Sequence, residues 1–227
     1  VERDCGVNEI GVVLHSGAST FPGYKQAEAN EGAWTDDNWF NSGDMGRIDD
    51  DGYLWLVGRA KDLIIRGGHN IDPLVTEDAL AAHPAVEVAA AVGKPDTYVG
   101  EVPVAFVQLI PGTTADEEEL INFDKGQVSE RAAAPVQVTI CDVLPVTAVG
   151  KIFKPALRKR AISSAFRAAA AIACPDIDFE IDVSDDKVLG IKVSLRPIST
   201  VSDHDSIERQ LKDSLQNFTQ AWELQQP

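Results

Sequence analysis

The sequence lacks the features of membrane, secreted and metal-binding proteins. No apolar run approaches the roughly 20 residues of a membrane-crossing helix, and the chain begins Val1-Glu2-Arg3-Asp4 without a signal peptide. Its 3 cysteines are far apart and outside any Cys-x-x-Cys pair, and its 4 histidines show no metal-ligand spacing. We therefore expect a cytoplasmic protein with no transmembrane segment, disulfide framework or metal site, cut from a longer polypeptide.

Positive charge is also scarce. The chain has 20 Lys and Arg against 36 Asp and Glu, a formal charge of -16, and such a surface repels a phosphate backbone. Nucleic acid is therefore excluded as a partner. The exception is residues 151–171, which hold 6 basic and no acidic side chains. With 227 residues, 44% of them hydrophobic, the chain is long and apolar enough to form one or two hydrophobic cores.

Hydrophobic patterning predicts an α+β fold in three parts. Residues 1–58 are rich in short β-type runs and read as a β-rich region. Residues 59–165 alternate strands with helices, including one that Asp72 caps ahead of Pro73. We expect this part to be a small domain with a central sheet flanked by helices.

Residues 166–227 read as an appended helix-hairpin-helix unit. Alternating apolar positions predict two strands that bury one face, over residues 177–183 and 189–195. An apolar stripe then predicts a closing helix, formed by Ile207, Leu211, Leu215, Phe218 and Trp222.

Three segments carry candidate chemistry. Ser42-Gly43-Asp44-Met45-Gly46 places a carboxylate among small residues, where it can accept hydrogen bonds from two vicinal hydroxyls. The stretch from Gly58-Arg59 through Lys61 to Gly67-Gly68 sets cations and glycines around one apolar run. The third segment presents Lys151 on a loop after Gly150, just before a basic helix.

In this order and at these separations, the three segments resemble the C-terminal third of the adenylate-forming superfamily. That superfamily includes acyl- and aryl-CoA synthetases, luciferases and the adenylation domains of nonribosomal peptide synthetases. The resemblance runs from about residue 11 to residue 160. It favours an acyl-CoA synthetase of the fatty-acid–CoA ligase type, because peptide-synthetase domains usually have Asp where Lys61 stands.

The resemblance implies a role for each candidate residue. Lys151 matches the catalytic lysine of carboxylate activation, Asp44 and Arg59 match nucleotide-binding positions, and Lys61 matches the hinge. Gly67 and Gly68 match the backbone along which the pantetheine of CoA passes. The complete enzyme would use ATP, Mg²⁺ and CoA to turn a fatty acid into an acyl adenylate and then a thioester. We expect none of these to bind tightly to this chain.

Parts of such an enzyme are missing from the sequence. It contains no Gly- and Ser/Thr-rich phosphate loop with lysine, so we expect the chain to be inactive alone and to need the remainder of its own large domain as partner. Two alternatives stay open: a non-catalytic binding module that keeps the fold, and an adenylation domain that serves a carrier protein. Lys154, Arg158, Lys159 and Arg160 either attract the phosphates of CoA or form a solvated helix face.

Overall fold

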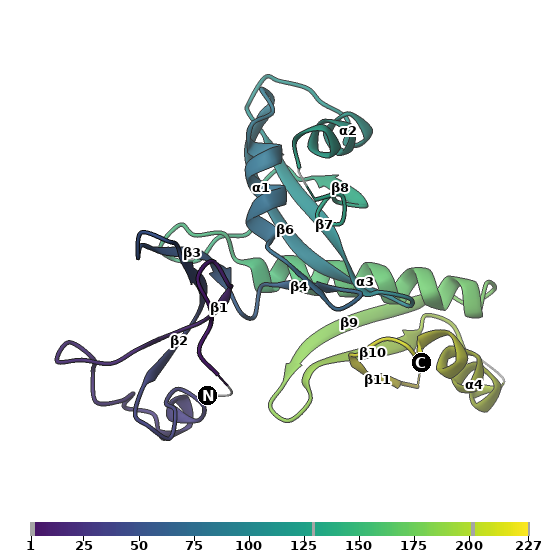
Figure 1. Ribbon diagram of the computed structural model, residues 1–227. Coiled ribbons are helices and arrows are strands. Elements are labelled where there is room, and N and C mark those ends of the chain that lie inside the picture. Colours follow the sequence, from purple (N-terminus) through teal and green to yellow (C-terminus); the bar gives the residue numbers. More distant parts are fainter. Residues whose placement is uncertain (1–2, 129, 201–202, 227) are drawn as a thin grey trace. The chain divides into compact units, whose positions relative to one another are not determined.

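The computed structural model describes residues 3–128, 130–200 and 203–226. The chain divides into two compact units, Val1–Leu63 and Ile64–Pro227 (Figure 1). Among the described residues, no helix is both long and apolar enough to cross a membrane.

The first unit is built on a small antiparallel sheet. Its order is β1 (Gly11–His15), β2 (Phe40–Ile48) and β3 (Leu54–Arg59), and a short 3-10 helix, η1 (Ala27–Asn30), lies in the connection between β1 and β2. The β1 and β3 strands follow the expected apolar runs. We did not expect β2, because its glycines and polar residues disfavour a strand when read locally. Pairing on both sides, to β1 and to β3, holds it in the sheet.

The second unit contains a five-stranded sheet. The strands run in the order β5 (His69–Ile71), β4 (Ile64–Arg66), β7 (Gly100–Leu109) and β6 (Val86–Asp96), and β8 (Gln137–Ile140) adds to β7 in parallel. The long β6–β7 hairpin is antiparallel throughout. Strands and helices thus alternate after residue 59, as the sequence predicts.

Helices cover both faces of this sheet. On one face α1 (Pro73–Ala81) and α2 (Glu117–Gln127) bury Leu80 and Leu120 against Val107 of β7. On the other face α3 (Lys154–Ala173) buries Leu157 against Val104. Successive β7 residues point to opposite faces of the sheet, so β7 contributes side chains to both hydrophobic cores.

Two of these helices begin at an aspartate cap, and the sequence predicts the first of them, at Asp72. The Asp72 carboxylate accepts a hydrogen bond from Leu74 N at 2.9 Å, and Pro73 occupies the first turn. The Asp116 carboxylate accepts one from Glu119 N at 2.8 Å. Each cap satisfies a backbone N–H that has no partner inside its helix.

The appended unit packs on the second half of α3. It consists of β9 (Phe179–Asp186), β10 (Gly190–Pro197), α4 (His204–Leu215) and β11 (Ala221–Leu224). Figure 1 shows α3 running between the five-stranded sheet and the β9–β10–β11 sheet. Phe166 of α3 is fully buried in the shared core with Leu195 and Leu211, so α3 belongs to two hydrophobic cores at once.

The closing helix, α4, is shorter than the sequence predicts. It ends at Leu215, and Trp222 lies on β11, which pairs in parallel with β10. The appended sheet therefore has three strands instead of the two expected. Phe218 still reaches the core, because its ring contacts Phe166 at 4.9 Å between centroids. Phe218 and Trp222 keep the apolar spacing of a helix. The open edge of β10, however, provides backbone hydrogen-bond partners for residues 221–224, and the sequence pattern does not reveal these partners.

Candidate active site

Asp44 and Arg59 face each other in the first unit. They are register partners across β2 and β3, and Arg59 Nε lies 3.1 Å from Asp44 Oδ1. The Arg59 side chain is 65% exposed and that of Asp44 30%. The two residues expected to bind a nucleotide thus lie together at the surface, with a carboxylate and a guanidinium both accessible.

The backbone of β2 around Asp44 is fixed by several hydrogen bonds. Ser42 Oγ donates to Val13 O at 2.8 Å and accepts from Asp44 N at 3.1 Å. Gly43 has a φ of 73°, a left-handed conformation that favours glycine, and its carbonyl accepts from Ala60 N at 3.0 Å. Ser42 and Gly43 therefore hold Asp44 opposite the end of β3.

Lys61 lies in the turn that follows β3. Asp62 N donates to Arg59 O at 2.9 Å and closes this turn, and the Lys61 side chain is exposed. The boundary between the two compact units falls just after it, between Leu63 and Ile64. The residue expected at the hinge is therefore close to the point where the chain passes from one unit to the other.

Gly67 and Gly68 form the tight turn between β4 and β5. Their φ angles are 57° and 83°, and Arg66 pairs with His69 across the turn. A two-residue hairpin with positive φ at both central positions strongly favours glycine. A Cβ at either position would meet nothing within 4 Å, so the requirement comes from the backbone conformation and the space above the turn is open.

Lys151 lies on a small closed loop in the second unit. Val146 and Ile152 form an isolated antiparallel bridge, and Thr147 N donates to Lys151 O at 2.7 Å while Lys151 N donates to Thr147 Oγ1 at 3.2 Å. Gly150 turns the loop with a φ of 80°. The backbone of Lys151 is thus fixed at both its N–H and its C=O.

The Lys151 side chain is exposed. Within residues 3–128, 130–200 and 203–226 its ammonium makes no ion pair. A lysine carried on a fixed loop with an accessible head group is suited to meet an anionic partner from outside the unit.

A mostly buried ion pair fixes the helix that follows this loop. Lys154 Nζ lies 2.8 Å from Glu77 Oε1, with side chains 20% and 13% exposed. The same Glu77 oxygen accepts from Ala91 N at 2.7 Å. Burial raises the pKa of the Glu77 carboxyl, against the lowering effect of Lys154 and of the Ala91 hydrogen bond. Glu77 thereby ties α1, β6 and the first turn of α3 together.

Sequence reasoning did not identify Glu77 or Thr147 as supports of the site. The spacing between Glu77 and Lys154 is too long for any local pattern, and only the fold brings the two together. Thr147 gave a weak signal, since a hydroxyl just before a Gly-Lys turn is a frequent acceptor of backbone N–H groups.

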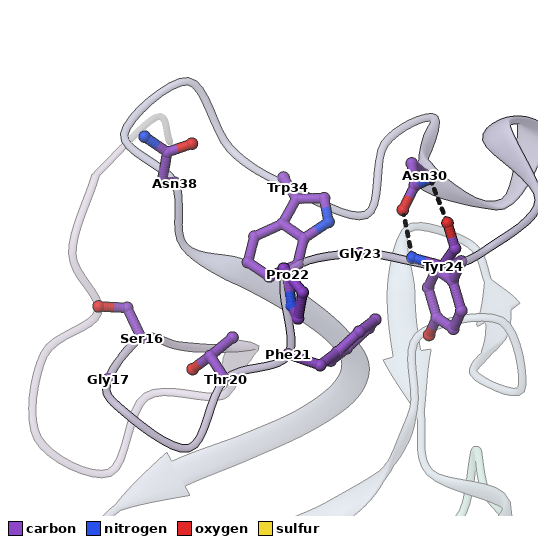
Figure 2. Close-up of a pocket in the computed structure, with 10 residues that line it drawn as sticks. All are labelled: Ser16, Gly17, Thr20, Phe21, Pro22, Gly23, Tyr24, Asn30, Trp34 and Asn38. Carbon is purple, nitrogen blue, oxygen red and sulfur yellow. Dashed lines mark hydrogen bonds between the residues drawn. The ribbon is translucent and has the colours of Figure 1, made fainter.

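A separate hollow of about 720 Å³ lies in the first unit. Figure 2 shows Phe21, Tyr24 and Trp34 around it, with Asn30 hydrogen-bonded to the backbone of Tyr24. Phe21, Tyr24 and Trp34 also contact one another or Phe40 ring to ring. None of the residues that line it is charged, so it offers neither the cation nor the carboxylate of the expected chemistry.

The chain is similar to several known proteins. Residues 76–151 match the family model of the AMP-binding enzyme C-terminal domain. The chain is 46% identical over 220 residues to marinolic acid–CoA ligase of Pseudoalteromonas sp. (strain SANK 73390), covering 97% of this chain and 34% of that protein. It is 38% identical to 2-succinylbenzoate–CoA ligase of Listeria innocua, covering 68% of this chain and 32% of that protein.

A solved structure gives the same correspondence. ATP-bound MatB from Rhodopseudomonas palustris matches with a TM-score of 0.65 and 33% identity, over 71% of this chain and 32% of that one. The chain thus spans about a third of the length of the relatives that it matches. The match to the marinolic acid ligase also extends through most of the appended unit, which the sequence resemblance did not reach.

The fold, the family model and these relatives lead to one assignment. The chain belongs to the adenylate-forming enzymes of the acyl-CoA synthetase type and corresponds to their C-terminal portion.

Proposed function

We propose that this chain is the C-terminal part of an AMP-forming acid–thiol ligase and supplies its catalytic lysine. The observation that carries the proposal is the Lys151 loop, which fixes the backbone of the lysine and leaves its side chain exposed. The relatives are CoA ligases of different acids. The substrate is therefore a carboxylic acid, and fatty acids are the first class to test.

In the first half-reaction, a carboxylate oxygen bonds to the α-phosphorus of ATP and pyrophosphate leaves. Two anions approach each other, and negative charge grows on the non-bridging oxygens. Lys151 offsets this charge, and removing one such preorganised group typically costs about 3–4 kcal/mol of transition-state stabilisation. Asp44 accepts hydrogen bonds from the ribose hydroxyls, and Arg59, beside it, also contacts the nucleotide.

In the second half-reaction, the CoA thiolate attacks the acyl carbonyl of the adenylate and AMP leaves. We propose that rotation at Lys61 withdraws Lys151 and brings up the Gly67-Gly68 turn, where no side chain blocks the pantetheine arm. A few terminal or loop residues are sufficient to absorb such a rotation. In this scheme, residues 1–58 end the large domain, 59–165 move, and 166–227 extend the moving part.

The rest of the site belongs to the remainder of the large domain. The chain has no phosphate loop, and the part of the chain that the structure describes has no cluster of three or more His, Cys, Asp or Glu suited to a metal ion. We therefore place Mg²⁺ and pyrophosphate with that remainder, and propose that the 227-residue chain is inactive by itself.

A chimera tests this division of labour. The N-terminal part of the marinolic acid–CoA ligase, joined to this chain, should release AMP and form a thioester when given ATP, CoA and a suitable acid. Each half alone should not. Turnover by the 227-residue chain alone, or an inactive but folded chimera, would count against the proposal. A phosphopantetheinylated carrier protein offered in place of CoA should be a poor acceptor.

A further inference from the structure

The hairpin that carries the Gly67-Gly68 turn is joined to the rest of its sheet by little β-ladder. Strands β4 and β7 share one register pair, Arg66 with Gly100, and Gly67 N donates to Val99 O at 2.7 Å. The neighbouring β6–β7 pairing, by comparison, runs along almost the whole length of both strands. The position of the turn therefore depends on contacts outside the ladder.

A side chain extends the connection where this ladder stops. Glu101 follows Gly100 on β7, and its Oε2 accepts a hydrogen bond from Ile65 N at 3.0 Å. The Glu101 side chain thus bonds to the backbone of β4 directly beyond the last ladder pair. A hydrogen bond from a backbone N–H to a carboxylate is shorter and stronger than one between neutral groups.

Two glycines leave room for this contact. A Cβ at Gly93 of β6 would lie 2.6 Å from Glu101 Cδ, so only a residue without a side chain lets Glu101 lie here. A Cβ at Gly100 would lie 3.3 Å from Ile65 O, and the φ of Gly100 is 82°, a conformation that favours glycine. Gly93 therefore accommodates the Glu101 side chain, and Gly100 lets β4 approach β7.

The other contacts of the hairpin hold its base. Ile64 and Ile71, which pair across β4 and β5, are both buried with Ala133. The Ile65 side chain, by contrast, is 55% exposed, so packing contributes little to its position. The hydrogen bond to Glu101 therefore fixes the part of β4 that leads into the turn.

We propose that Glu101 is a positioning residue for thioester formation, whose carboxylate holds Ile65, and through it the Gly67-Gly68 turn, in the arrangement that the pantetheine arm requires. The proposal rests on the proposed function, which brings this turn to the arm in the second half-reaction. Glu101 acts through the backbone of β4 and does not touch the reacting atoms. Adenylation depends on Lys151 instead and does not need Glu101.

Amide hydrogen exchange in the 227-residue chain tests the contact without an assay of activity. Glu101→Ala should speed the exchange of the Ile65 N–H at least 10-fold, because this N–H loses its acceptor. Glu101→Gln should exchange nearly as the parent does, since the amide oxygen also accepts a hydrogen bond. The N–H of Ala105, a buried residue of β7, is the internal reference for an intact sheet. Unchanged exchange at Ile65 in Glu101→Ala would overturn the proposal.

The two half-reactions of the chimera test the consequence for catalysis. Glu101→Ala should slow thioester formation from supplied acyl adenylate and saturating CoA at least 10-fold. It should leave adenylate formation, trapped as the hydroxamate with hydroxylamine, close to that of the parent. Glu101→Gln should restore the rate of thioester formation. Glu118→Ala, at an exposed position of α2, is the matched control and should change neither rate.

A second variant keeps the carboxylate and displaces it. Gly93→Ala places a methyl group against Glu101 Cδ, and the backbone of Gly93 lies outside the left-handed region, so the flexible Glu101 side chain has to move. This variant should slow thioester formation as Glu101→Ala does. Gly126→Ala is its control, because a Cβ at Gly126 of α2 would meet nothing within 4 Å.

Three outcomes in the chimera would overturn the proposal. Glu101→Ala could leave thioester formation unchanged, or it could slow both half-reactions equally, which would indicate a general loss of structure. Glu101→Gln could be as slow as Glu101→Ala, which would mean that the negative charge matters and not the bond to Ile65. A parent chimera that forms no adenylate would instead contradict the proposed function, and the exchange of the Ile65 N–H would still decide whether Glu101 holds β4.

Discussion

Arg59 Nε lies 3.1 Å from Asp44 Oδ1, and the two residues are register partners across β2 and β3. The pair holds the Asp44 carboxylate at a fixed place without burying it. Since the Arg59 side chain is mostly exposed, the pair contributes little to stability. Its use is to position a carboxylate whose remaining lone pairs can accept two ribose hydroxyls.

Replacing Asp44 should therefore affect nucleotide binding more than folding. In the active chimera, Asp44→Asn should raise KM for ATP about 10-fold or more, because hydrogen bonds to a charged group contribute about 1.5–3 kcal/mol. Its urea midpoint should hardly change. Asp51→Asn, in the exposed β2–β3 turn, is the control. Equal values of KM for Asp44→Asn and the parent would remove Asp44 from the nucleotide site.

The Glu77–Lys154 pair should be important for stability. Glu77→Gln leaves the mostly buried Lys154 ammonium without its partner and should lower the free energy of unfolding by about 2–3 kcal/mol. Adding Lys154→Met should recover much of this loss, because both charges are then gone. Urea denaturation of the two single variants and the double variant gives the coupling energy. Additive effects would mean that the pair does not fix the first turn of α3.

Asp124 should make the stability of the chain depend on pH. It is fully buried on α2, and neither carboxylate oxygen has a hydrogen-bond partner among the residues that the structure describes. Burial raises the pKa of the Asp124 carboxyl to about 7. The folded state thus holds this proton more tightly than the unfolded state, so the stabilisation is full below the ordinary pKa and is lost as pH rises through 7.

Asp124→Asn should remove this dependence. Between pH 5 and pH 8, the parent should lose about 2 kcal/mol more unfolding free energy than the variant, after allowance for solvent screening. Urea unfolding at the two pH values measures the difference. Parallel pH profiles for the two proteins would show that Asp124 is ionised in the fold.

Phe166 should couple the appended unit to the rest of the second unit. Its side chain is fully buried and contacts the Phe218 ring. Phe166→Ala should cost about 3–5 kcal/mol of unfolding free energy. Ile172→Ala, on the same helix but 81% exposed, should cost less than about 0.5 kcal/mol. A small effect of Phe166→Ala would mean that the appended unit packs only loosely on α3.

Much of the fold was predictable because its signals are local. Asp72 and Pro73 marked the start of α1, and the alternating pattern marked β9 and β10. Strand β11 was missed because Phe218 and Trp222 continue a helical spacing, while the partner that makes residue 222 a strand residue lies on β10. Strands of this kind depend on partners distant in sequence, which local propensity does not encode.

The candidate site likewise has parts that the sequence predicts and parts that only the fold reveals. Asp44, Arg59 and Lys151 were named through ordered segments that resemble a family, and the structure adds how each is held. The support that Glu77 gives to α3 and the hydrogen bond between Glu101 and Ile65 depend on contacts between distant segments. No periodicity or motif predicts such contacts, since only the folded backbone brings them together.

In the proposed reaction, Lys151 acts in carboxylate activation and leaves the site before the thioester forms. Measuring the two half-reactions separately in the chimera tests it most directly, with Lys187→Ala in the exposed β9–β10 turn as control. Lys151→Ala should slow adenylation by about 100-fold or more, while thioester formation from supplied acyl adenylate and CoA stays close to that of the parent. Equal loss of both steps, or normal adenylation, would contradict this account.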